Sequence, residues 1–141
     1  MTNHEHLLEL FHNILKKMKK KWYNQLDGLT PTQYHILKKL ASSGPQKATE
    51  LAEVIQITPG AITGASDKLV TEGFAQRRGV EEDRRVVYLE ITETGKELVE
   101  SLIKNHKKVT AQFFSGLPEE DIRHLIRIYD QLSANLDRLD S

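Results

Sequence analysis

The feature that most constrains the fold is a change in hydrophobic period close to Gly73. Before it, "ATELAEVI" (48–55) and "TPGAITGASDKLVTEG" (58–73) carry apolar residues at helical spacing. After it, "FAQRR" (74–78) and "RVVYLEI" (85–91) alternate in the manner of strands, and "GVEEDR" (79–84) is expected to be the loop between them. Two short helices followed by a hairpin predict a helix-turn-helix with a two-stranded wing.

Capping residues place the helix starts of this segment. Thr30 before Pro31, with Gln33 three positions after Thr30, predicts a capped helix that carries Tyr34, Leu37 and Leu40 on one face. Thr58 before Pro59 predicts the start of the last helix of the helix-turn-helix, and Gly73 predicts its end.

Long amphipathic helices are predicted on both sides of this module. Residues 5–26 carry one apolar stripe, residues 92–115 a second and residues 117–141 a third. The fold class is therefore mainly α (α+β). A single domain over 1–141 is expected, with an N-terminal helix in 1–28, the winged helix-turn-helix in 29–91 with its wing at about 74–91, and C-terminal helices in 92–141. Stripes this wide favour packing against a second copy in a homodimer over a monomeric bundle.

Composition and the absence of certain motifs exclude several classes of function. The chain has no cysteine, so it has no disulfide, thiolate nucleophile or thiol redox sensor. No apolar run approaches the roughly 20 residues of a membrane helix, and the N-terminus has no signal-peptide layout, so a soluble, cytoplasmic protein without membrane association is expected. There is no phosphate-binding glycine loop, nucleophile elbow or helical His-x-x-x-His pair, so neither a catalytic residue nor a cofactor is expected.

The helix from Thr58 has the composition of a helix that enters the major groove of DNA. We expect its exposed residues to be small, which allows close approach of the backbone: Gly60, Ala61, Thr63, Gly64 and Ser66. Thr58 and Thr63 can hydrogen-bond phosphates or bases, and Lys68 should reach the DNA backbone. The alternative is that the glycine and alanine content serves close packing between helices.

The hairpin tip is rich in arginine. Arg85 is the candidate for the minor groove, Asp83 could orient its guanidinium group, and Arg84 would face a phosphate. Residues 47–91 nevertheless hold six basic and eight acidic side chains, a net charge of −2. DNA binding thus requires the basic side chains to be sorted onto one face. If they are not sorted in this way, the charged residues of the hairpin form only weak ion pairs on a solvated surface.

Together these residues resemble the winged helix of the MarR family of bacterial transcriptional regulators. The strongest marks are the helix end "DKLVTEGF" (67–74) and the wing "DRRVVYLEITETG" (83–95), in which Asp83 and Arg85 match the family's Asp-x-Arg motif. "LTPTQYHIL" (29–37) resembles the start of the family's second helix, and the resemblance covers essentially the whole chain.

The resemblance implies a homodimer that binds a pseudo-palindromic double-stranded DNA operator, most often as a repressor released by a small-molecule effector. By position it implies DNA contacts from Lys47, Thr49, Thr58, Pro59, Ala61, Thr63, Gly64, Ser66, Lys68, Arg77, Arg84 and Arg85. Many relatives have a basic residue where this chain has Gly64, which puts a contact there in doubt.

Three further readings remain open. A metal-responsive regulator of the same fold could use His12, His35 and His106, although no metal site is expected from the spacing. An effector pocket between the first two helices and the helix after the wing could be lined by Trp22, Tyr23, Tyr34 and Phe113, which could equally be ordinary core. A winged helix used only for protein–protein contact is the third, and the hairpin arginines argue against it.

Overall fold

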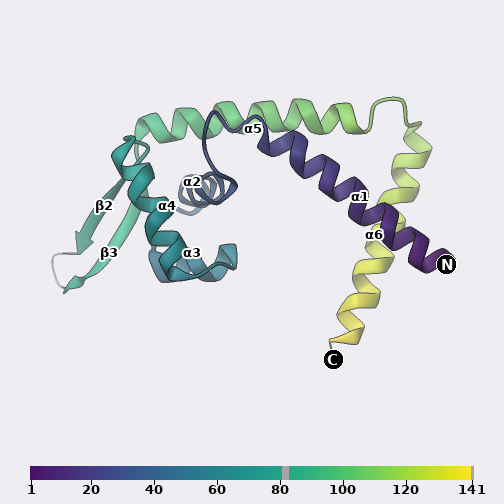
Figure 1. Ribbon diagram of the computed structural model, residues 1–141, viewed down its shortest axis with the longest axis horizontal. Coiled ribbons are helices and arrows are strands. Elements are labelled where there is room, and N and C mark those ends of the chain that lie inside the picture. Colours follow the sequence, from purple (N-terminus) through teal and green to yellow (C-terminus); the bar gives the residue numbers. More distant parts are fainter. Residues whose placement is uncertain (81–82, 141) are drawn as a thin grey trace. The chain divides into compact units, whose positions relative to one another are not determined.

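A computed structural model of the chain describes residues 1–80 and 83–140, apart from the side chains of 80–85. It contains six helices and three strands within these residues (Figure 1). In chain order they are α1 (Asn3–Tyr23), α2 (Pro31–Ser43), β1 (Gln46–Lys47), α3 (Ala48–Ile55), α4 (Pro59–Thr71), β2 (Ala75–Val80), β3 (Asp83–Ile91), α5 (Glu93–Phe113) and α6 (Glu119–Leu139). The predicted class, a mainly helical winged helix, is confirmed.

The helix starts of the central module follow from local hydrogen bonds. The Thr30 hydroxyl accepts the backbone N–H of Gln33 at 3.2 Å, while the Gln33 side chain accepts the N–H of Thr30 at 2.9 Å. Thr58 caps α4 by accepting the N–H of Ala61 at 3.2 Å. These bonds satisfy amide groups that a helix end leaves unpaired, so both predicted starts are confirmed.

Helix α1 is shorter than its apolar pattern predicted. It ends at Tyr23, and Leu26 lies beyond it in a turn where Asp27 and Gly28 both have positive φ. Leu26 and Leu29 are buried in the core. They are placed there by this turn and not by a longer α1. The apolar spacing continued past the helix because the turn also faces the core.

The strands form an antiparallel sheet in the order β1-β3-β2. The two-residue strand β1, which no sequence pattern indicated, pairs Gln46 with Leu89 and Lys47 with Tyr88. In the wing, β2 pairs with β3 as far as Val80 opposite Asp83, with an irregularity at Gly79 and Val80. The strands therefore extend further than the predicted six-residue loop allowed, and Figure 1 shows the hairpin projecting beyond the helices.

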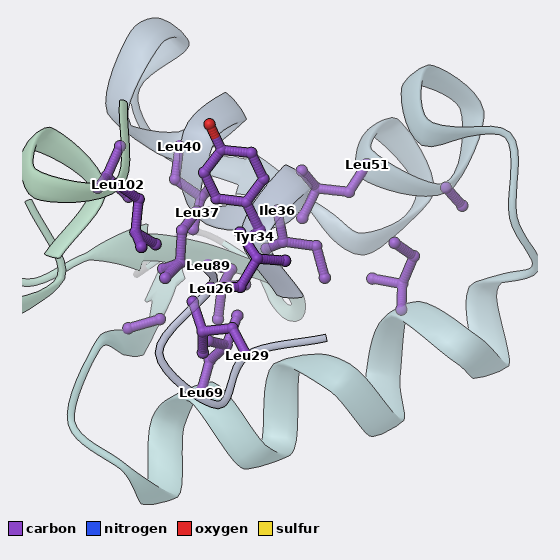
Figure 2. Packing of buried hydrophobic residues seen from close by; sticks show 14 residues of the cluster. Leu26, Leu29, Tyr34, Ile36, Leu37, Leu40, Leu51, Leu69, Leu89 and Leu102 are labelled. Atoms are coloured by element: carbon purple, nitrogen blue, oxygen red, sulfur yellow. The ribbon is translucent and has the colours of Figure 1, made fainter. Parts of the chain in front are cut away.

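The core of the module lies between α2, α3, α4, the sheet and the first part of α5. Figure 2 shows Tyr34, Ile36, Leu37 and Leu40 of α2 at its centre, with Leu51, Leu69, Leu89 and Leu102 arriving from other elements. Burial of this many aliphatic side chains is the main force holding α3 and α4 in place. The two helices are thus presented by a rigid support.

The chain divides into two compact units, Met1–Lys107 and Lys108–Ser141. In the first, α1 has no buried residue and exposes Leu7, Leu8, Leu10, Phe11 and Ile14. In the second, α6 also has no buried residue and exposes Ile126, Ile128, Tyr129, Leu132, Leu136 and Leu139. Each unit therefore leaves a helix with an uncovered apolar face. No described helix is long and apolar enough to cross a membrane.

Candidate nucleic-acid interface

One face of α4 packs on the core and the other faces solvent. Ile62, Ser66 and Leu69, at spacings of four and three, are buried. The exposed face carries the remaining candidates of this helix and its cap: Thr58, Pro59, Ala61, Thr63, Gly64 and Lys68, together with Gly60 and Asp67. A helix held along its inner side with a small-residue outer side has the shape of a groove-reading helix.

The expectation that Ser66 is exposed is wrong. Only 5% of its surface is accessible, because it lies one turn after Ile62 and one before Leu69 on the inward face. The helical spacing from Ile62 was the signal that could have excluded it from the list of DNA-facing residues. The other candidates of this helix keep their exposure.

Packing within this chain does not explain the glycines of α4. A Cβ atom added to Gly60 or to Gly64 meets no described atom within 4 Å. A glycine inside a helix costs roughly 0.5–1 kcal/mol relative to alanine. The open space beside both residues therefore argues against close helix packing and in favour of a partner that approaches the backbone from outside.

The two threonines retain different hydrogen-bonding capacity. The Thr58 oxygen accepts the Ala61 amide, which leaves its O–H free to donate to an acceptor such as a phosphate oxygen. The Thr63 hydroxyl donates to the Pro59 carbonyl at 3.0 Å, which leaves its oxygen lone pairs free to accept. Thr58 is thus suited to phosphate, and Thr63 to an amino group on a base edge.

Lys47 and Thr49 lie at the start of α3. Lys47 is the N-cap residue, and its ammonium group lies 5.7 Å from the centre of the Tyr88 ring. Thr49 is exposed in the first turn. Strand β1 joins the start of α3 to the wing, because Lys47 pairs with Tyr88 of β3.

The two wing arginines whose side chains are described are paired with acids rather than sorted away from them. Arg77 forms an ion pair with Asp67 of α4, and Arg78 lies 3.5 Å from Glu90 on the adjacent strand. Lys47 and Lys68 have no ion pair within the described part of the chain. The acidic residues that made the module net negative are thus partly neutralised in place. Asp67, which was not among the residues predicted to act in DNA binding, forms the ion pair between α4 and the wing.

The proposed tip residues are only partly described. Asp83, Arg84 and Arg85 begin strand β3, and their side chains lie outside the described part of the structure, as do residues Glu81 and Glu82 entirely. The contacts expected of Asp83, Arg84 and Arg85 stay predictions from the sequence.

A second cluster of polar rings joins α1, α2 and α5. His106 Nε2 lies 3.2 Å from the Trp22 carbonyl oxygen, and its Nδ1 lies 3.4 Å from the Tyr34 hydroxyl. Because a carbonyl only accepts, neutral His106 carries its proton on Nε2 and accepts from Tyr34 on Nδ1. His35 Nε2 lies 3.3 Å from the Tyr23 hydroxyl. Three of the four aromatic residues expected to line a pocket here, Trp22, Tyr23 and Tyr34, pack against these histidines.

Both histidines of this cluster resist protonation. Burial lowers the pKa of His35, and the positive charges of Lys38 and His106 lower it further. Burial also lowers the pKa of His106. The hydrogen bond to the Trp22 carbonyl acts in the opposite direction and raises this pKa, whereas the positive charge of Lys38 lowers it further. Protonating His106 would also turn Nδ1 into a donor facing the Tyr34 hydroxyl, which would have to reverse its own bond.

Acidification is therefore expected to destabilise the protein. An unfolded chain takes up these protons near pH 6.5, before the folded protein does, so the free energy of unfolding should fall as the pH drops below about 6.5. Thermal unfolding followed by circular dichroism between about pH 8 and pH 5 measures the slope. His35→Gln with His106→Gln should flatten it relative to wild type, and His6→Gln, at an exposed position of α1, should not. An unchanged slope in the double variant would exclude the cluster as its origin.

The described residues contain no group of three or more His, Cys, Asp or Glu side chains that could hold a metal ion. His35 and His106 face tyrosine hydroxyls and a backbone carbonyl instead of carboxylates. The geometry gives the metal-responsive reading no support from this part of the chain.

Sequence comparison relates this chain to known regulators. A model of the MarR family matches residues 29–87. The HTH-type transcriptional repressor MdtR of Bacillus subtilis is 31% identical over 127 residues, which are 90% of this chain and 81% of that protein. The HTH-type transcriptional repressor YetL of the same organism is 32% identical over 116 residues, covering 78% and 70% of the two chains.

Solved structures share the fold. A MepR-like protein complexed with pseudoligands is 34% identical, with a TM-score of 0.64 over 96% of this chain and 97% of that one. MepR, a transcription regulator of the Staphylococcus aureus multidrug efflux pump MepA, has a TM-score of 0.83 at 21% identity and covers 96% of this chain and 99% of its own. The resemblance stated from the residues is thereby confirmed.

Proposed function

This chain belongs to the MarR family of DNA-binding, winged-helix transcriptional regulators, and on that premise we propose that it is a homodimeric repressor that binds a pseudo-palindromic operator and is released by a small-molecule effector. Its relatives are transcriptional regulators and not enzymes. A repressor of this kind acts in the cytoplasm, where the DNA is.

The outer face of α4 carries the proposal. Its glycines at 60 and 64 have open space beside them, its threonines have unused hydrogen-bonding capacity, and Lys68 lies further along the same helix without an ion pair among the described residues. Such a face can lie close to base edges while its ends meet phosphates. Arg77 and the wing would add contacts beside it.

The uncovered helix faces support a dimer. The exposed apolar side chains of α1 recur at positions 7, 8, 11 and 14, and those of α6 recur at 126, 129, 132, 136 and 139. Monomeric proteins rarely leave apolar stripes of this length in water. A second copy would cover the apolar face of each helix, and a symmetric dimer on a two-fold operator would place two α4 helices roughly 34–36 Å apart on the DNA.

Leu8→Glu is expected to convert the dimer to a monomer without unfolding it. Leu8 is 56% exposed, so its replacement costs the chain's own core little, whereas a carboxylate in an apolar interface is strongly unfavourable. Sedimentation velocity gives the mass, and circular dichroism checks the helix content. Asn13→Glu, at an exposed polar position of the same helix, adds the same carboxylate and is the charge-matched control, which should remain dimeric. A dimeric Leu8→Glu variant would place the interface elsewhere.

The proposal of repression and of release by an effector rests on the names of the relatives. MdtR and YetL are both named as repressors, and the MepR-like protein was crystallised with pseudoligands. A repressor in the DNA-bound state needs an input that ends repression. An effector that binds the free protein more tightly than the DNA-bound one would lower operator affinity by about five- to 150-fold.

Arg85→Ala is expected to weaken operator binding by at least about tenfold, the loss of roughly 1.4 kcal/mol. The reason is the loss of a guanidinium group from each wing in a narrow minor groove. Fluorescence anisotropy with an operator duplex gives the affinity. Arg78→Ala is the matched control, because it removes an arginine of the same hairpin that is engaged with Glu90. Equal effects of the two variants would contradict a specific role for Arg85.

A genomic pull-down tests the proposal as a whole. The purified protein is mixed with fragmented host DNA at moderate salt, and bound fragments are sequenced. One enriched inverted repeat with half-sites a helical turn apart is the expected result. Titrating salt against an operator and a random duplex then separates specific from phosphate binding, which falls steeply with salt. A dimeric, folded protein that enriches no sequence after dialysis and chelation would overturn the operator and favour a protein-interaction module.

A further inference from the structure

An open cleft of about 370 Å³ lies between α2 and α3, inside the winged-helix module. One face of α2 lines it with His35, Lys38, Lys39 and Ser42, and the end of α3 lines it with Val54 and Ile55. The volume falls within the range of roughly 300–1,000 Å³ typical of small-molecule sites. It is not the aromatic pocket expected between α1, α2 and α5, of whose residues Trp22, Tyr23 and Tyr34 pack against His35 and His106.

The polar side of the cleft is positively charged and unneutralised. Lys38 and Lys39 form no ion pair with any described carboxylate, and no acidic residue lines the cleft. The Ser42 hydroxyl lies one turn beyond Lys38 and Lys39 on the same face. Its O–H donates to the Lys39 carbonyl at 3.2 Å, so the two ammonium groups are the donors that this wall offers to an anion.

The opposite wall is aliphatic. Val54 is 56% exposed although it is a large apolar residue, and Ile55 is only half-buried. No Phe, Tyr or Trp lines the cleft, and the His35 imidazole is the one ring among its lining residues, so an aromatic ligand gains less there than the aliphatic wall offers to a hydrocarbon chain. A ligand that covers this wall gains the burial of its own apolar surface and that of Val54.

We propose that this cleft binds an aliphatic carboxylate, with its carboxylate on Lys38 and Lys39 and its hydrocarbon chain on Val54 and Ile55. The cleft then serves as the effector site of the regulator, a role that rests on the proposed function. Both walls are needed to select this ligand. An inorganic anion has no hydrocarbon chain for the aliphatic wall, and a neutral lipid has no charge for the lysines.

The position of the cleft connects it to the DNA-facing helix. Helix α3 ends at Ile55, and Gln56 in the left-handed conformation and Ile57 lead directly to Thr58, the cap of α4. A ligand that bridges α2 and α3 therefore acts on the support of α4. His35 lines the same cleft and contacts Tyr23 of α1, so the ligand also acts on the end of α1.

Calorimetry with the full-length protein and no DNA tests the cleft separately from the repressor function. Octanoate is expected to bind, benzoate to bind more weakly, and 1-octanol and inorganic phosphate to bind at least about tenfold more weakly than octanoate, because each lacks one half of the recognition. Benzoate binding as tightly as octanoate would overturn the aliphatic assignment. Phosphate binding as tightly would overturn the need for a chain.

Variants locate the site. Lys38→Gln with Lys39→Gln should weaken octanoate by at least about tenfold, since it removes both charges and leaves a polar side chain at each position. Val54→Asn should weaken octanoate and leave phosphate unchanged. Lys17→Gln with Lys21→Gln on α1 is the matched control for charge. Undiminished octanoate affinity in the double α2 variant would overturn the site.

Operator anisotropy with and without octanoate then tests the effector role. A loss of operator affinity of about five- to 150-fold, absent from the double α2 variant, is expected. An operator found by pull-down together with no octanoate binding would overturn the cleft alone. Octanoate binding to the cleft without an operator would overturn the repressor function alone, and octanoate binding without a change in operator affinity would overturn the effector role.

Discussion

Gly64→Leu is expected to abolish operator binding while it stabilises the folded protein. A Cβ atom at this position meets no described atom within 4 Å, and the position lies on the exposed face of α4, so a larger side chain can extend into solvent in the free protein. Replacing a mid-helix glycine by leucine improves helix propensity by roughly 0.5–1 kcal/mol and should raise Tm by about 2–5 °C. In the complex, the same side chain would occupy the space through which α4 approaches the DNA.

Opposite signs of the two effects make this prediction specific. Gly64→Ala should show the same pattern with a smaller loss of affinity, because a methyl group displaces the helix less. Thr71→Leu, at the exposed end of α4, is the control for added apolar surface and should leave operator binding within about threefold, or 0.7 kcal/mol. Wild-type affinity in Gly64→Leu, measured by anisotropy, would mean that this turn of α4 does not lie in a groove.

Gly95→Ala is expected to have the largest effect on folding. A Cβ atom at this position would overlap the carbonyl oxygen of Phe74 and lie 2.7 Å from Ile91 Cγ1. The Phe74 carbonyl cannot turn away, because it accepts the N–H of Thr92 at 3.1 Å. The Thr92 hydroxyl in turn donates to the Gly73 carbonyl at 2.7 Å and accepts the N–H of Gly95 at 3.1 Å.

This arrangement ties the start of α5 to the first residues of the wing, so the methyl group must separate them. Overpacking costs roughly 1–3 kcal/mol where side chains can adjust, and a clash with backbone belongs at or above the upper end of that range. Urea unfolding monitored by circular dichroism should show a loss of about 3 kcal/mol or more. Gly60→Ala, which adds the same methyl group into open space, should lose nothing. Equal stability of the two variants would contradict the close approach of α5 to the wing.

Several elements could be predicted because local chemistry determines them. The caps at Thr30 and Thr58 depend on hydrogen bonds between residues three positions apart, so the residue types in sequence are sufficient to place them. The change from helical to strand period near Gly73 likewise reports which side of each element meets the core. The exposed apolar stripes of α1 and α6 follow from the same periodicity.

Other features depend on which distant segments meet, and the residue pattern does not contain that information. Strand β1 exists only because Gln46 and Lys47 reach Leu89 and Tyr88, more than 40 positions later, and two residues are too few to show a period. The partners of His35 and His106 come from separate helices, so single histidines in the sequence could not be assigned to a polar cluster.

The sequence by itself therefore determined the order of the helices and of the two wing strands, the caps of α2 and α4, the apolar faces and the family. The tertiary structure alone decided that Ser66 faces the core, that Asp67 joins Arg77, that Gly95 must lack a side chain, and that Lys38 and Val54 share a cleft. The physical reason is the separation along the chain of the residues that interact. Periodicity and capping act within a few residues along the chain, whereas ion pairs, close backbone approaches and clefts arise when packing of the core brings separate elements together.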